Sequence, residues 1–213
     1  MPESPFQWFV SRRVYIWKSN GRVVTPARLN QWVEKAMSGT SEEMRQVGLK
    51  LIAGEINRAE WAIESGEQIR NLHRSLGMLA AGGRNQMNAR RWGQVGGVLQ
   101  RELAYFNRFA SYVDNQDIEN LGERFLSRTQ KYAQAGWATW QNAVRARETE
   151  HGGMLEQNLL GASTHSCSEC IAQSELGFVP VGELVPIGER ICGPNCNCFI
   201  EYKERNAASE EAA

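Results

Sequence analysis

All five cysteines of this 213-residue chain lie near its C-terminal end, where they form two clusters. The first cluster is the C-x-x-C motif of Cys167 and Cys170, and the second contains Cys192, Cys196 and Cys198. A C-x-x-C spacing lets two thiolates bind one ion at about 2.3 Å from each sulfur. A tight turn through the Gly-Pro-Asn sequence of the second cluster can fold its thiols toward the first. Two such clusters joined by a polar loop predict a closed structural zinc site.

A tetrahedral zinc site needs four ligands, and the chain offers five cysteines. Cys196 and Cys198 are two residues apart, so their side chains would share one face of a strand. We expect four of the five thiolates to bind the metal: Cys167 and Cys170, with two of Cys192, Cys196 and Cys198. The loop between the clusters, residues 177–188, has few large apolar side chains, so its order is expected to depend on the ion.

Two alternatives to this ligand set stay open. His165 stands beside the first cluster as a substitute ligand, although a single histidine there is more often a surface residue. The cysteines could also form disulfides and leave one thiol free. The start of the chain lacks the basic residues and apolar run of a secretory signal, so we expect a cytosolic chain with reduced thiols. That favours the metal, whereas slow oxidation in an extracellular particle would favour disulfides.

Composition excludes several classes of protein. The 24 basic and 24 acidic residues give a formal net charge of zero, which argues against strong attraction of the whole chain to nucleic acid. No apolar run is long enough to span a membrane. There is no phosphate-binding loop or dinucleotide-binding glycine pattern, and the Asp, Glu and His residues do not cluster with catalytic spacing. We therefore expect no catalytic residues and no enzymatic activity.

The N-terminal half contains a hairpin signal followed by helical stripes. Asn20-Gly21 separates the strand-prone segments 14–17 and 22–24, which predicts a hairpin that rests on the helices or on another subunit. Thr25-Pro26 opens a first helix that Gly39 is expected to end. Thr40 and Glu43 form a capping box for a second helix, with a break expected near Gly66 and a stop at residues 82–83.

The second half continues with two long amphipathic helices, over residues 85–113 and from Asp117 to about residue 152. The short link between them predicts antiparallel neighbours. Residues 150–164 are expected to be a linker, and residues 199–202 a closing strand. The fold class is therefore mainly α, with long antiparallel helices, a short N-terminal β-hairpin and a small cysteine-rich, zinc-type module. The expected domains are four: an extended arm at 1–25, a helical body at 26–160, the module at 161–202 and a flexible acidic tail at 203–213.

The second cysteine cluster resembles a motif of the Mu F-like minor head proteins of tailed phages, the head-morphogenesis family. Those proteins have a helical body, a C-x-x-C motif and a terminal H-P-x-C-x-C motif. The Pro194-Asn195-Cys196-Asn197-Cys198 core matches, whereas Gly193 replaces the family's histidine and Cys192 stands one residue earlier. The motif covers about the last fifth of the chain, and the resemblance elsewhere is architectural.

This resemblance implies a virion structural protein at the head or head-tail junction, near the portal, assembled in the host cytoplasm. It would act by contacts with the portal or other head and neck proteins within an oligomeric assembly, with a structural zinc ion and no membrane. It could also touch packaged DNA. The alternative is a zinc-bearing nucleic-acid-binding protein, supported by a basic stretch between Arg70 and Arg108. Its arginines are Arg70, Arg74, Arg84, Arg90, Arg91, Arg101 and Arg108. A solvated helix face is the plainer interpretation of that stretch.

Overall fold

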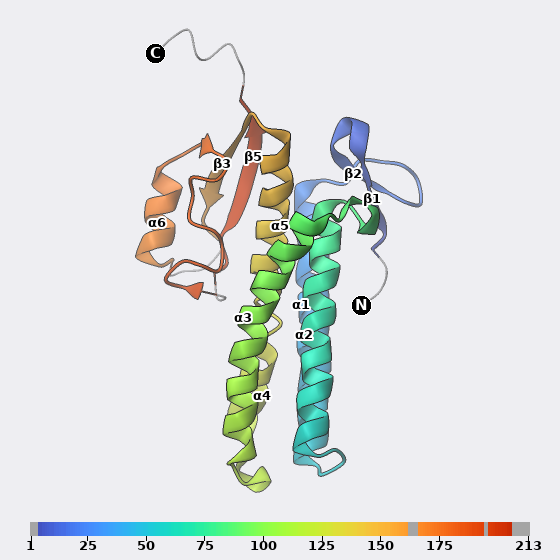
Figure 1. Cartoon of the computed structure of the whole chain (residues 1–213), viewed down its shortest axis with the longest axis vertical. Coiled ribbons are helices and arrows are strands. Elements are labelled where there is room, and N and C mark those ends of the chain that lie inside the picture. Colours follow the sequence, from blue (N-terminus) through green and yellow to red (C-terminus); the bar gives the residue numbers. More distant parts are fainter. Residues whose placement is uncertain (1–3, 162–165, 194–195, 206–213) are drawn as a thin grey trace. The chain divides into compact units, whose positions relative to one another are not determined.

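The computed structural model describes residues 4–161, 166–193 and 196–205 of the chain. It confirms a mainly helical protein with an N-terminal antiparallel hairpin and a C-terminal cluster of neighbouring cysteines (Figure 1). The chain divides into two compact units, Met1–Trp140 and Gln141–Ala213, so the division falls inside α5 (Gly136–His151), before the boundary expected near residue 160. Within the described ranges, no helix is both long and apolar enough to cross a membrane.

The hairpin pairs β1 (Phe6–Phe9) with β2 (Val14–Trp17), through the short 3-10 helix η1 (Val10–Arg12). The pairing expected across Asn20-Gly21 is reduced to a single bridge between Ile16 and Val23. The hairpin rests on the first unit's helices, because the Tyr15 hydroxyl donates to the carbonyls of Leu79 and Ala80 at the end of α2. The Leu79 carbonyl also accepts from the Gly82 amide that caps α2, so the tyrosine adds a second donor at the helix end, where carbonyls lack their usual intrahelical partners.

The first two helices differ from the sequence expectation in where they break. α1 is continuous from Pro26 to Ile52, so the stop at Gly39 and the new start at Thr40 were wrong. The apolar stripe runs through that point, and Thr40 is itself buried within it. α2 (Arg58–Ala81) begins instead after Asn57, whose side chain forms a capping box with Glu60.

The end of α2 matches the sequence expectation, whereas the break near Gly66 does not. Gly66 lies inside α2, so that expectation was wrong. Gly82 ends the helix in a left-handed conformation with φ of 98°. A Cβ at this position would lie 2.7 Å from the Trp8 ring, so the glycine also lets the hairpin approach. After the 3-10 turn η2 (Arg84–Gln86), the chain reverses into the next helix.

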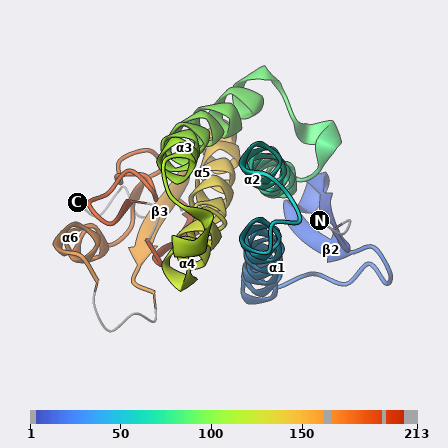
Figure 2. The ribbon, with the colours of Figure 1, turned by 90° about the horizontal axis from the view of Figure 1, so that it is seen from below.

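In the third and fourth helical regions, the structure agrees with the sequence expectation of one long helix for the third region but not for the fourth. α3 spans Ala89–Asp114, as the stripe predicted, but the region after Asp117 is not one helix. It contains η3 (Ile118–Asn120), α4 (Glu123–Lys131), a series of turns and then α5. α1, α2 and α3 run in alternating directions, with α4 against α1, which Figures 1 and 2 show for this unit.

Five aromatic rings form the centre of the first unit's core. Trp61 of α2 contacts Phe106 and Phe109 of α3 and Phe125 of α4, with ring centroids between 5.2 and 5.8 Å apart. Tyr132, just after α4, packs on Phe106 and Phe109. Tilted and edge-on rings at these separations attract one another beyond the area that they bury. The aromatic stripes are therefore core, as their spacing indicated.

The second unit is built on a three-stranded antiparallel sheet in the order β4-β3-β5. β3 (Met154–Leu159) is the central strand, between β4 (Val179–Pro180) and β5 (Phe199–Glu204). The linker expected over residues 150–164 was therefore wrong, since most of its described part is this strand. β5 confirms the closing strand and extends two residues beyond the module's expected end at residue 202. Residues 206–213 of the expected tail lie outside the described part of the chain.

A buried ion pair fixes the loop that leads to the second cysteine cluster. Glu156 of β3 is fully buried and accepts hydrogen bonds from Arg145 of α5, at 2.9 and 2.5 Å. Its Oε1 also accepts from the backbone amides of Gly182 and Leu184. Arg145 in turn donates to the Leu184 carbonyl. Because the carboxylate is both paired and hydrogen-bonded, its burial is tolerated and the loop is held against β3.

Candidate metal centre

The first cysteine cluster lies at the start of α6 (Ser168–Glu175). Cys167 is the N-cap residue, and its Sγ accepts a hydrogen bond from the Cys170 amide at 3.4 Å. Cys170 lies one turn into the helix and is only 2 % exposed. The C-x-x-C spacing therefore places both sulfurs at the same helix end, because a cap residue folds back over the first turn.

The second cluster lies between the loop and β5. Cys192 follows the loop, and the Cys196 amide donates a hydrogen bond to the Gly193 carbonyl oxygen at 3.2 Å. Cys196 and Cys198 are both buried, whereas Asn197 between them is exposed. The two sulfurs thus lie on the interior side of the segment that enters β5, as their spacing of two residues predicted.

The five thiols form two overlapping groups that share one residue. Cys167, Cys170 and Cys192 have sulfurs within 4.8 Å of one another, and so do Cys170, Cys196 and Cys198. The Cys170 sulfur lies 3.6 Å from the sulfurs of both Cys192 and Cys196. Four sulfurs at about 2.3 Å from a zinc ion would lie about 3.8 Å apart, so these separations suit a tetrahedral site. All five are free thiols in the structure.

A buried arginine and asparagine surround Cys170. Arg190, which is 3 % exposed, places Nη1 3.7 Å from the Cys170 sulfur and donates to Asn158 Oδ1 at 2.7 Å. Asn158 of β3 donates back to the Cys170 carbonyl at 3.0 Å. Arg190 also donates to the Val185 carbonyl. This network joins the sheet, α6 and the loop at the one cysteine that both groups share.

One glutamate and one glutamine of α6 hold the same loop through hydrogen bonds. Glu169 accepts from the Ile191 amide at 2.7 Å, directly before Cys192. Gln173 accepts from the Val185 amide at 2.8 Å. The spacing between Cys170 and Cys192 is therefore set by hydrogen bonds as well as by chain length. Arg190, Asn158 and Glu169 could not be predicted as part of the site, because nothing in their local sequence marks them as partners of a cysteine.

The environments of the thiols differ in their effect on protonation. The hydrogen bond from the Cys170 amide lowers the pKa of Cys167 to about 7. Burial raises the pKa of the thiols of Cys170, Cys192 and Cys196. Arg190 opposes that rise at Cys170, since its guanidinium favours the thiolate. A bound cation would offset the cost of deprotonating the buried sulfurs, because metal thiolate bonds form only with the deprotonated ligand.

The other predicted site residues lie in the first unit or in a part of the chain that the structure does not describe. His165 falls in the undescribed range 162–165. The basic stretch lies in the first unit, and the structure separates its members. Arg91 is used internally, since its Nη1 donates to the carbonyls of Ala81 and Gln86. Arg90, Arg101 and Arg108 are exposed on α3.

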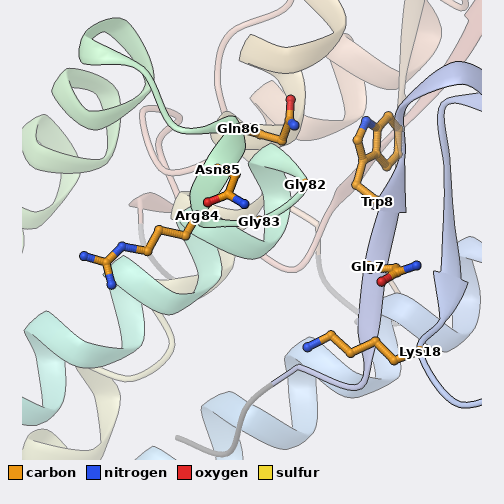
Figure 3. A pocket seen from close by; sticks show the side chains of 8 residues that line it. All are labelled: Gln7, Trp8, Lys18, Gly82, Gly83, Arg84, Asn85 and Gln86. Carbon is orange, nitrogen blue, oxygen red and sulfur yellow. The ribbon is translucent and has the colours of Figure 1, made fainter.

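A hollow lies beside the N-terminal hairpin. Figure 3 shows its lining, which includes Trp8 and Lys18 from the hairpin side and the turn from Gly82 to Gln86. Its volume is about 490 Å³, but it is open to solvent. The Arg84 side chain extends away from Trp8 rather than across the hollow (Figure 3). Because it is open to solvent, this hollow differs from a typical ligand pocket, which buries most of its ligand's surface.

No protein-family model, curated protein or solved structure matches this chain in the comparisons with known proteins. The structure itself defines a helical protein whose second unit brings cysteines close enough together to hold a metal ion.

Proposed function

We propose that this chain is a structural protein of a tailed-phage virion, a minor head component near the portal that carries one structural zinc ion. It acts through contacts with the portal or other head and neck proteins, in an oligomeric assembly. The observation that carries the proposal is the convergence of the two cysteine clusters. They include the Pro194-Asn195-Cys196-Asn197-Cys198 sequence, which resembles the head-morphogenesis motif. The long helices of the first unit supply a scaffold for such contacts.

Zinc is the metal that this donor set suits best. Thiolates are soft ligands, and closed sites of four cysteines in structural modules most often hold zinc. Zinc with four thiolates carries a net charge of −2, which the buried guanidinium of Arg190 would partly offset. The ion would fix the loop between the clusters, and no catalytic role is proposed for it. Cys170 belongs to every ligand set that we propose, together with three of Cys167, Cys192, Cys196 and Cys198.

The experiment that tests the virion role is quantification of this protein in purified particles. Gradient-purified virions should contain it in low copy, at a fixed ratio to the portal protein. Its loss should leave particles defective in head assembly or head-tail joining. Complete absence from mature particles and from their assembly intermediates would refute the proposal, whatever metal the purified protein holds.

A further inference from the structure

The outer face of α3 carries an alternating row of arginine and tyrosine side chains. Arg101, Tyr105, Arg108 and Tyr112 follow a four-three-four spacing, which places them on one stripe of the helix. Tyr105 is 50 % exposed and Tyr112 is 55 % exposed. Arg90, eleven residues before Arg101, continues the stripe because eleven residues are close to three helical turns. The stripe from Arg90 to Tyr112 is about 33 Å long at the usual helical rise.

The charge of this stripe has one sign. Between Ala89 and Val113 the exposed charged side chains are all arginines, because the one acidic residue, Glu102, is 8 % exposed and lies about 100° round the helix from the stripe, where it interacts with Arg101. Burial raises the pKa of Glu102, and the neighbouring Arg101 opposes that rise. Although the formal net charge of the whole chain is zero, positive charge is concentrated on this stripe of α3.

A neighbouring helix adds a further guanidinium. Arg128 of α4 lies over the Phe109 ring, 4.4 Å from its centroid, and interacts with Tyr132. Arg108 also acts electrostatically on Tyr132, whose hydroxyl donates to the Tyr105 carbonyl. Arg108 and Arg128 therefore approach the same tyrosine from different helices. Their mutual repulsion would be relieved by an anion bound between or across them.

We propose that this arginine–tyrosine surface, formed by Arg90, Arg101, Tyr105, Arg108, Tyr112 and Arg128, binds single-stranded nucleic acid. The arginines would contact successive phosphates of an extended strand. The Arg108 guanidinium lies over the Tyr105 ring, 4.7 Å from its centroid. The Tyr112 ring and the other face of the Tyr105 ring would stack on bases, as aromatic side chains do in single-strand-binding proteins. This function goes beyond the proposed virion role and does not depend on the zinc site.

An acidic protein partner fits the stripe less well. The centre of a stable protein interface is an apolar patch that becomes fully buried. Apart from the two separated tyrosine rings, the stripe offers Gln94, Gly97 and Ala104 beside its arginines, with no large aliphatic side chain. Association with a second copy through the same face would oppose arginine to arginine. A linear chain of phosphates needs no apolar centre.

The test is binding of the full-length, metal-loaded protein to a labelled oligodeoxythymidine of about 20 nucleotides, followed by fluorescence anisotropy. We expect binding that weakens steeply between about 50 and 200 mM salt. The Arg101→Glu, Arg108→Glu double variant should lose at least about tenfold in affinity, with a shallower salt slope by about 1.4. The matched control is Arg28→Glu, Lys35→Glu on exposed positions of α1, which should bind as the wild type does.

A second pair of variants tests stacking. Tyr105→Ala with Tyr112→Ala should weaken binding at least about fivefold for each ring, whereas the two Tyr→Phe changes should preserve affinity. Alanine suits an exposed helix position, so folding should be unaffected. The proposal is overturned if the wild type does not bind at low salt or if the α1 control weakens binding equally. It is also overturned if the Ala variants bind normally, if duplex DNA binds as tightly, or if polyglutamate competes as well as the oligonucleotide.

Discussion

At the scale of single residues, Cys170 has the most clearly defined role. Every other cysteine belongs to one of the two sulfur groups, whereas Cys170 belongs to both. Cys170→Ser leaves four thiols in number, but it should leave neither group intact and therefore reduce the bound metal from about one ion per chain to none. Cys167→Ser and Cys198→Ser each preserve one group of three, so they should weaken metal binding without abolishing it. Metal analysis after gel filtration measures all three; an unchanged metal content in Cys170→Ser would contradict the assignment.

Arg190 is the residue whose role is to position and balance that centre. Its removal takes away a guanidinium beside the Cys170 sulfur and the bond to Asn158. Arg190→Leu should lower zinc affinity about 10- to 100-fold, as loss of the groups around a metal's ligands typically does. Arg190→Lys keeps the charge and should recover part of the loss. Competition with a chromophoric chelator gives the affinities, and equal values for wild type and Arg190→Leu would count against this role.

His73 makes the first unit sensitive to acid. It is fully buried, its Nδ1 lies 2.6 Å from Thr139 Oγ1, and burial lowers its pKa from 6.5 to about 4. Between these pH values the unfolded chain binds a proton that the folded chain does not, so stability falls as pH falls from 6.5 to 4. The loss is about 3 kcal/mol for this shift. In His73→Gln the free energy of unfolding should depend less on pH across this window. Denaturant titrations at several pH values measure it, and parallel curves for the two proteins would contradict the argument.

At the scale of helices and strands, the close approach of α2 and α3 depends on Gly77. A Cβ there would lie 2.4 Å from Val95 Cγ2, whereas one at Gly39 on α1 meets no atom of the described residues within 4 Å. Gly77→Ala should therefore destabilise the protein by about 1–3 kcal/mol through overpacking. Gly39→Ala, the matched control, should stabilise it by about 0.5–1 kcal/mol through helix propensity. Thermal unfolding distinguishes them, and stabilisation by both changes would show that the two helices can separate at no cost.

Some of these helices and strands could be predicted from the sequence, and others could not. The α3 stripe, the stop at Gly82 and the closing strand β5 all follow local rules of periodicity and capping. β3 was missed because Glu156 and Asn158 occupy its two most buried positions, which reverses the expected polarity. Their burial depends on Arg145 and Arg190, which are distant in sequence. The break before α2 depends on the capping box of Asn57 and Glu60. It was not predicted, because the apolar pattern continues across it. The five cysteines were found from spacing, but their overlap at Cys170 required the fold.

At the scale of the whole molecule, the division into two units predicts a local response to metal removal. The second unit's loop is held by the cysteines and by hydrogen bonds to Glu156, Glu169 and Gln173. The expectation of few large apolar side chains there was wrong in one respect, because Leu184 and Ile187 of this loop are buried. The first unit has its own aromatic core around Trp61. A strong chelator should therefore increase hydrogen exchange in α6, the loop and the start of β5. It should leave α1, α2 and α3 as protected as before, so the far-ultraviolet helix signal should change little.

The matched comparison for this experiment is Cys170→Ser without chelator, which should give the same exchange pattern because it lacks the ion. Trp61→Ala is the opposite control, since loss of a large core side chain costs about 3–5 kcal/mol and should deprotect α1 to α3 instead. Together these proteins separate metal loss from core loss. If chelation deprotects the helices and the loop to the same extent, the two units unfold as one cooperative structure. The metal would then stabilise the whole protein, because the unfolding of either unit would require the unfolding of both.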